Sequence, residues 1–148
     1  DAVKPKQAKF TLEMLGWGMP DSPDRCLQLI KAVDREAFGV HLDPCNLVCS
    51  PERYYRTTDL LNECFDKLGK WIVSCHAKDV TWKHEGQINI RETCPGTGVL
   101  DYETYLKRLA ELPQGPPLML EHLKGAAEYA KARDYILEVG KKTGLSFE

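Results

Sequence analysis

The sequence has no apolar run near the roughly 20 residues that a membrane-spanning helix requires. Its net charge is −2, so no excess of basic residues favours nucleic acid or an anionic membrane as a partner. The polar stretch from Asp1 to Lys9 has no apolar segment behind it, unlike a signal peptide. These absences favour a cytoplasmic protein that binds neither nucleic acid nor a membrane.

An initiating methionine and C-x-x-C pairs are also absent. Because the initiating methionine is missing, we expect a processed product or a fragment. Because C-x-x-C pairs are missing, a zinc knuckle is not expected. Most of the six cysteines stand in apolar or helical contexts, where we expect reduced thiols rather than a disulfide framework. They are Cys26, Cys45, Cys49, Cys64, Cys75 and Cys94.

A length of 148 residues suits one domain, 1–148, and 43% hydrophobic residues provide for a packed core. Short β-prone runs alternate with segments of helical periodicity, which predicts an α/β fold with a parallel sheet. We expect a long polar loop over 82–98. The expected strands are 8–15, 38–43, 71–76 and 117–121, and the expected helices begin at Pro23, at Pro51 (ending before Gly69), after Asp101 and at Ala126.

A carboxylate or a histidine stands at or near the end of each expected strand, namely Glu13, Asp43, His76 and Glu121. The carboxyl ends of parallel strands form one edge, which is the ligand-binding side of such folds. Charge at the end of a buried strand is costly unless it is paired or bound to a metal. Four such residues in four successive strands therefore predict a common site.

Each of these residues also has an ordinary structural explanation. Glu13 alone fits a solvent-facing strand end equally well, Asp43 fits a turn before a proline, and a lone His76 fits a core histidine. Glu121 is followed by His122, and strand alternation sends these two side chains to opposite faces. The residues alone leave both explanations open, as they do the choice between Glu121 and His122.

Three carboxylates and one imidazole make a mixed oxygen and nitrogen site, which suits one Mn²⁺, Mg²⁺, Co²⁺ or Zn²⁺ ion. Four protein ligands leave open positions on an octahedral ion for two adjacent oxygens of a hydroxy-carbonyl substrate. The ion would polarise the carbonyl and stabilise an enediolate. One carboxylate would remove the proton beside the carbonyl and another would return it.

Five stretches together match a known family: Thr11–Glu13, Gly39–Asn46, Cys75–Asp79, Pro95–Tyr102 and Leu118–Glu121. With its D-P-x-N, H-x-K-D and G-x-G-x-x-D segments in this order, the sequence resembles the xylose isomerase-like TIM-barrel superfamily of sugar and sugar phosphate isomerases and epimerases. The resemblance implies strands five to eight of the family barrel and one divalent metal ion. It assigns the metal to Glu13, Asp43, His76 and Glu121, with Glu13 and Glu121 as the acid–base pair.

A complete barrel needs about 250 residues and eight strands, and this sequence supplies four expected strands. We expect a fragment, in which the first and last strands are open edges. The alternatives are two copies that combine as a homo-oligomer, or an N-terminal half-barrel from another chain. The metal ligands are then present, and part of the substrate pocket lies elsewhere.

Departures from the family pattern suggest substrate contacts. Several family epimerases have a histidine where this chain has Asn46, and an arginine shortly after the metal-binding histidine, where it has Lys78 and Lys83. Asn46 and Lys78 are therefore candidate substrate-binding residues. We expect Asp79 to orient Lys78 or His76 from behind the ligands.

Two further groups have less specific interpretations. His41 lies two residues before Asp43 and shares its face, so we expect it to line the barrel interior beneath the metal or to pack there. Gly96 and Gly98 resemble part of a phosphate loop, but a short G-x-G is weak evidence, and we expect a turn at the mouth of the pocket.

The function that the resemblance favours is a metal-dependent sugar isomerase or epimerase. A keto-polyol dehydratase uses the same enolisation chemistry, and a catalytically inactive fragment is a further hypothesis. An endonuclease IV-type DNA-repair enzyme shares the fold but needs a histidine-rich site and a basic face. Four histidines, Asn46 and a net charge of −2 argue against it. The expected partner is a small sugar or keto-polyol.

Overall fold

The computed structural model describes residues 4–84 and 88–146. Four parallel strands form one sheet in the order β1-β2-β3-β6, and β4 pairs with β5 as an antiparallel hairpin. The strands are β1 (Phe10–Glu13), β2 (Phe38–Leu42), β3 (Ile72–Ala77), β4 (Asp79–His84), β5 (Ile88–Thr93) and β6 (Leu118–Leu120). The helices are α1 (Pro23–Val33), α2 (Pro51–Tyr55), α3 (Thr57–Leu68), α4 (Tyr102–Ala110) and α5 (Gly125–Lys142), with short 3₁₀ turns at Pro44–Leu47 and Gly69–Trp71.

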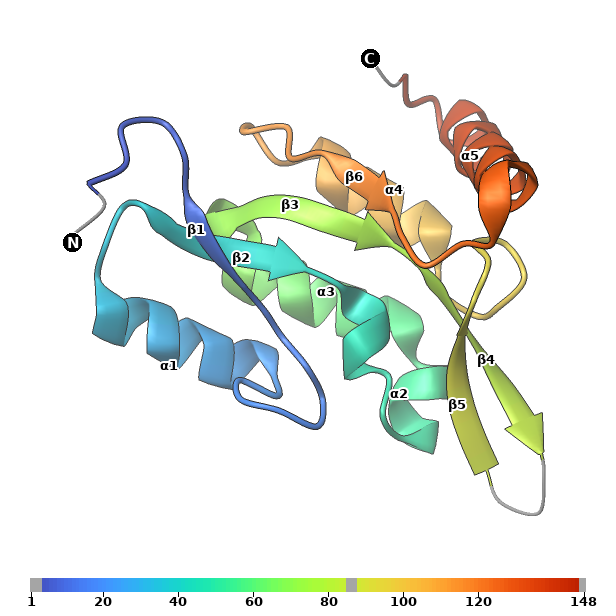
Figure 1. Cartoon of the computed structure of the whole chain (residues 1–148), viewed down its shortest axis with the longest axis horizontal. Helices are drawn as coiled ribbons and strands as arrows, with labels where there is room; N and C mark the ends of the chain where they lie inside the picture. The colour runs from blue at the N-terminus through green and yellow to red at the C-terminus, as the bar shows by residue number, and fades with distance from the viewer. Residues whose placement is uncertain (1–3, 85–87, 147–148) are drawn as a thin grey trace.

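Each parallel strand is followed by a helix, which confirms the expected α/β class of four strand–helix units. The helices form an outer layer in which α1 contacts α3, α3 contacts α4, and α4 contacts α5 (Figure 1). β1 and β6 are the two edges of the sheet. None of the helices in the described part of the chain combines the length and the apolar character needed to cross a membrane.

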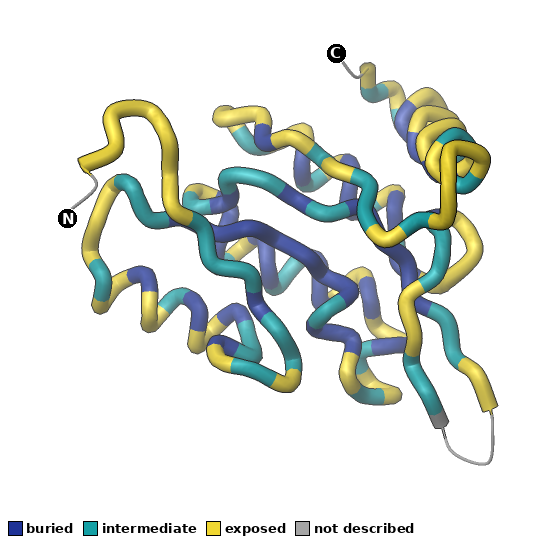
Figure 2. The backbone as a smooth tube through the Cα atoms, in the orientation of Figure 1, coloured by how far each residue is buried: buried dark blue, intermediate teal, exposed yellow. Residues whose placement is uncertain are grey.

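Alternation along the strands separates the core from the site. Val40 and Leu42 on β2 are fully buried, and buried residues continue into the helices beside the sheet (Figure 2). Two buried tyrosines of α4 fix the backbone at the end of β3. Tyr105 Oη donates to the carbonyl of His76 over 2.9 Å, and Tyr102 Oη donates to the carbonyl of Lys78 over 2.8 Å. The helical layer thus holds the strand end that carries the site.

The helix expected from Pro51 is instead two helices, because the backbone turns at Arg56 (φ −130°, ψ 46°). The break lets Thr57 begin α3 and bind the start of α4. The Thr57 hydroxyl donates to the carbonyl of Val99 over 2.9 Å and accepts from the amide of Asp101 over 3.2 Å. These long-range bonds outweigh the helical periodicity of the segment.

The long polar loop expected over 82–98 is wrong, because β4 and β5 occupy much of it. Trp82 lies opposite Ile90 in their register. Val80 is buried, and Trp82 packs edge-on against Tyr54 with ring centroids 5.4 Å apart. The alternation of apolar and polar residues in β4 and β5 is short and includes many charged residues, so the sequence alone does not predict these strands. The apolar contacts that stabilise the hairpin form only in the folded chain.

Candidate metal centre

The ends of the four parallel strands bring Glu13, Asp43, His76 and Glu121 together. Nδ1 of His76 lies 3.6 Å from Oε1 of Glu13 and 3.4 Å from Oδ2 of Asp43. The same nitrogen lies 3.1 Å from Oε2 of Glu121. All four predicted ligands therefore lie at the ends of four different strands, with the three carboxylates around one nitrogen of His76. Ligand atoms of Asp43, His76 and Glu121 lie within 4.8 Å of one another.

Two of these ligand atoms are buried and lack hydrogen bonds. Within residues 4–84 and 88–146, Oδ2 of Asp43 and Nδ1 of His76 have no hydrogen-bond partner. The other oxygen of Asp43 accepts from the amide of Cys45 over 3.0 Å. Because a buried polar atom without a partner is costly, two such atoms only 3.4 Å apart fit a bound cation. The donor set therefore suits a divalent metal ion.

Lys78 is a buried cation inside the same group, with a side chain only 4% exposed. Its Nζ lies 2.9 Å from Oδ2 of Asp43, 2.7 Å from Oε2 of Glu121 and 3.1 Å from Oε1 of Glu92. The contact with Asp43 has the distance of an ion pair but not hydrogen-bond geometry, so that oxygen still lacks a donor. Lys78 thus balances part of the negative charge of the centre.

The charged side chains of the centre change one another's pKa values. Burial opposes protonation of Lys78, but its close contacts with the carboxylates of Glu121 and Asp43 outweigh burial and raise its pKa above the ordinary value. Burial likewise opposes ionisation of Glu121, yet the hydrogen bond from Lys78 lowers the pKa of Glu121 below its ordinary value. Both groups are therefore charged at neutral pH.

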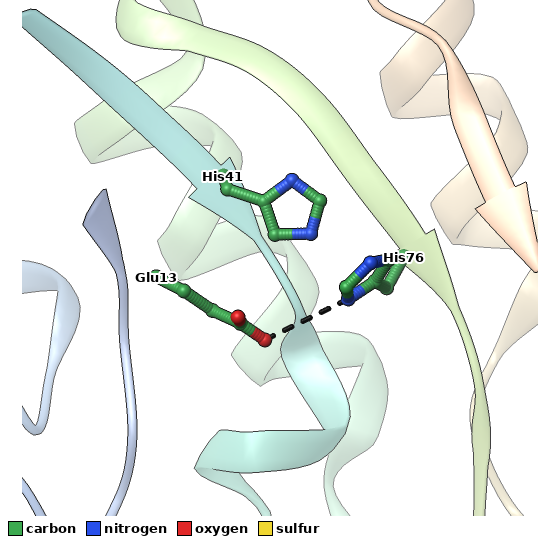
Figure 3. A group of neighbouring side chains, drawn as sticks. All are labelled: Glu13, His41 and His76. Carbon is green, nitrogen blue, oxygen red and sulfur yellow. Dashed lines mark ion pairs between the residues drawn. The ribbon is translucent and has the colours of Figure 1, made fainter. Parts of the chain in front are cut away.

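The predicted substrate contact Asn46 touches a candidate ligand directly. Its Nδ2 donates to Oε1 of Glu13 over 2.7 Å, which fixes one carboxylate oxygen. His41 lies on the same face, where its Nδ1 is 2.6 Å from Oγ of Ser74. Figure 3 shows the rings of His41 and His76 beside the Glu13 carboxylate. The centroids of the two rings are 4.0 Å apart. Burial, and then the neighbouring His76, lower the pKa of His41 and favour its neutral form.

Comparison of the sequence with models of protein families shows to which family the chain belongs. The chain matches the model of the xylose isomerase-like TIM barrel over residues 1–139. The chain belongs to this family. No curated protein sequence matches it.

Solved structures of xylose isomerase-like barrels share the fold. A xylose isomerase domain protein from Planctomyces limnophilus is 27% identical with a TM-score of 0.70, and the match covers 92% of this chain and 46% of that one. A xylose isomerase-like TIM barrel protein from Mycobacterium smegmatis in complex with magnesium is 22% identical with a TM-score of 0.70, over 91% and 44%. A D-tagatose 3-epimerase-like protein is 16% identical with a TM-score of 0.66, over 92% and 48%. The chain thus spans less than half the length of these xylose isomerase-like barrels.

In this xylose isomerase-like chain Asp79 has a role other than the one expected. Its carboxylate is buried and accepts four backbone amides rather than orienting the metal-binding histidine or the preceding lysine. Oδ1 accepts from Val80 over 2.8 Å and from Leu100 over 2.9 Å. Oδ2 accepts from Gly96 over 3.0 Å and from Gly98 over 2.9 Å. The glycine amides are therefore bound to Asp79 and not open to a phosphate.

Two residues of the centre were not predicted from the sequence. Glu92 on β5 accepts from Nζ of Lys78, and its other oxygen lies 2.9 Å from Nδ1 of His122. His122 also lies near Glu121, with 3.5 Å between Nε2 and Oε1. Strand alternation does not separate Glu121 and His122, because β6 ends at Leu120 and His122 has a φ of 58°. A correct assignment of the hairpin would have been the only sequence signal for Glu92.

Proposed function

We propose that this chain carries the metal centre and the acid–base pair of a sugar isomerase or epimerase, which transfers a proton next to a carbonyl through an enediolate. The observation that supports this most is the convergence of three carboxylates and an unpartnered buried imidazole nitrogen at the strand ends. The family membership and the likeness to an epimerase-like barrel agree with it.

Glu13, Asp43, His76 and Glu121 would hold one divalent ion, Mn²⁺, Mg²⁺, Co²⁺ or Zn²⁺. When bound, such an ion supplies a Lewis acid that polarises the substrate carbonyl. A likeness to a magnesium-bound barrel is consistent with this choice of ions. Differences in burial suggest how the chain's own residues divide the remaining work.

Glu13 and Glu121 are the better candidates for proton transfer, because their side chains are 35% and 34% exposed and a substrate can reach them. The side chain of Asp43 is fully buried, which suits a purely metal-binding role. Asn46 would keep one oxygen of Glu13 fixed while the other takes a proton from carbon. A general base placed in this way contributes about 10²- to 10⁴-fold to the rate.

Lys78 would stabilise negative charge on the substrate oxygen. Its ammonium group already lies among Asp43, Glu121 and Glu92, and it lines a polar cavity of about 220 Å³ together with Glu121 and His122. A cation placed beside the substrate oxygen favours a developing oxyanion. The cavity is a suitable place for the hydroxyl groups of a sugar or keto-polyol.

The edges β1 and β6 are where the rest of a barrel would pair. In an eight-stranded barrel each of these strands has a neighbour on both sides, and the related barrels are about twice as long as this chain. We propose that a complementary half-barrel completes the substrate pocket. A second copy of this chain or further strand–helix units would supply it.

The test is exchange of solvent deuterium into the carbon next to the carbonyl of a panel of ketoses, aldoses and cyclic keto-polyols. We expect metal-dependent exchange, reduced at least about 100-fold in Glu13→Gln and Glu121→Gln. Glu103→Gln, at an exposed position of α4, is the matched control. Loss of water from a keto-polyol would identify the dehydratase instead. Metal-loaded protein whose barrel is completed by the complementary half and that still exchanges no substrate would contradict the proposal.

A further inference from the structure

The proposed function gives no role to a buried ring nitrogen of His41. The residue is 8% exposed and lies on β2 facing the metal centre. Its Nδ1 is 2.6 Å from Oγ of Ser74, whereas its Nε2 has no hydrogen-bond partner in the part of the chain that the structure describes. Leaving such an atom unsatisfied costs about 1–3 kcal/mol. A residue that merely filled space would avoid this cost if it were apolar.

The imidazole of His41 is close to two of the candidate ligands. Ligand atoms of Glu13, His41 and His76 all lie within 4.8 Å of one another. Glu13 and His41 are directly paired across β1 and β2, so the backbone fixes their proximity. Figure 3 shows the three side chains extending toward the same space from three neighbouring strands. Opposite ligands of an octahedral ion are about 4.2 Å apart, so a small side-chain movement completes the group.

We propose that Nε2 of His41 is a direct ligand of the divalent ion, which gives the centre two imidazoles instead of one. This inference rests on the metal centre of the proposed function. The hydrogen bond to Ser74 supports it, because a proton on Nδ1 that is donated to Oγ leaves the lone pair of Nε2 free for a metal. A second imidazole selects Zn²⁺ or Co²⁺ over Mg²⁺, which prefers oxygen ligands.

The role of a ligand and the role of a packing residue differ in what they do to metal preference. Loss of a packing residue disturbs the whole centre and lowers the affinity for every metal ion in a similar way. Loss of an imidazole ligand lowers the affinity for metal ions that prefer nitrogen ligands and leaves the affinity for Mg²⁺ nearly unchanged. The ratio of Zn²⁺ affinity to Mg²⁺ affinity therefore separates the two roles.

The experiment titrates the full chain, stripped of metal, with Zn²⁺, Co²⁺ and Mg²⁺ by calorimetry, and records the visible spectrum of bound Co²⁺. In His41→Leu we expect Zn²⁺ and Co²⁺ affinity to fall at least about tenfold, Mg²⁺ affinity to stay within about threefold, and the Co²⁺ spectrum to change. Ser74→Ala should lower Zn²⁺ affinity by a smaller factor. His84→Gln, at an exposed position of β4, is the histidine control.

The outcomes distinguish the two proposals. Equal losses of Zn²⁺ and Mg²⁺ affinity in His41→Leu, or no loss at all, would overturn the role of His41 and leave the four-residue centre intact. A wild-type chain that binds none of the three metals would overturn the centre itself. Circular dichroism checks the fold of each variant. If His41→Leu does not fold, His41→Gln and Ser74→Ala decide the outcome by the same affinity ratio.

Discussion

Replacement of Asp79 by asparagine tests how the loop 94–100 is held beside the metal centre. The two oxygens of Asp79 accept four amides, and Oδ2 serves both Gly96 and Gly98. An asparagine keeps the shape but turns one oxygen into an NH₂ donor. Two backbone amides then face a donor instead of an acceptor, whichever way the amide is oriented.

The size of this effect follows from the bonds that are lost. Two hydrogen bonds to a charged acceptor contribute about 1.5–3 kcal/mol each, or about 3–6 kcal/mol together. Removal of the charge recovers part of this, because burial raises the pKa of Asp79 and so penalises its ionised form. We therefore expect Asp79→Asn to lower the free energy of unfolding by about 3 kcal/mol, which corresponds to a melting temperature lower by about 6–12 °C.

Thermal and urea unfolding, followed by circular dichroism, measure this loss. Asp134→Asn is the control, because that carboxylate is 63% exposed on α5 and pairs with its neighbour Arg133. The control should change the stability by less than about 0.5 kcal/mol. A melting temperature of Asp79→Asn equal to that of the control would refute the role of Asp79 as the centre of this loop.

Two other substitutions test the packing between β2 and β3 and the charges of the helical layer. Gly39→Ala should destabilise the fold by about 1–3 kcal/mol in urea unfolding, because the added Cβ would lie 2.5 Å from Cγ2 of Val73; a neutral result would show that β2 and β3 have room to separate. Burial opposes ionisation of Glu63, but hydrogen bonds from Arg53 and Lys67 outweigh it and lower its pKa. Since the folded pKa is below the unfolded value of about 4.3, this group stabilises the fold above that pH, and the contribution is lost as pH falls through the folded pKa. Glu63→Gln should therefore cost less than about 1 kcal/mol at pH 7, and this cost should shrink as the pH falls below the unfolded value of about 4.3. A cost that does not change with pH would contradict the pKa assignment.

Three strand ends could be read from the sequence, because Asp43, His76 and Glu121 are the last residues of the expected strands, and a parallel sheet places such ends at one edge. The end of the first strand could not, because Met14 and Leu15 continue the apolar run and the expected strand 8–15 extends beyond Glu13, where β1 ends. The expected helix starts at Pro23 and after Asp101 rest on similarly local signals, and in the structure Ser22 and Asp101 accept the amides of Arg25 and Thr104. Local signals of this kind need no knowledge of the rest of the fold.

The contacts of Lys78 and Asp79 could not be predicted, because their partners come from distant segments. Lys78 is buried only because Asp43, Glu121 and Glu92 surround it, and Glu92 belongs to a hairpin that the sequence hides. Asp79 faces amides about twenty residues farther along the chain. The burial of a charged residue depends on such tertiary partners and not on its neighbours in sequence.

Metal content is the most direct test of the account. The full chain, dialysed against Mn²⁺, Mg²⁺, Co²⁺ or Zn²⁺, should bind one ion per chain by elemental analysis. Asp43→Ala and His76→Ala remove the two buried ligand atoms, and each should reduce the affinity at least about 100-fold. Asp134→Ala and His84→Ala are the matched controls and should retain the ion. Undiminished metal content in both Asp43→Ala and His76→Ala would contradict the assignment of the centre.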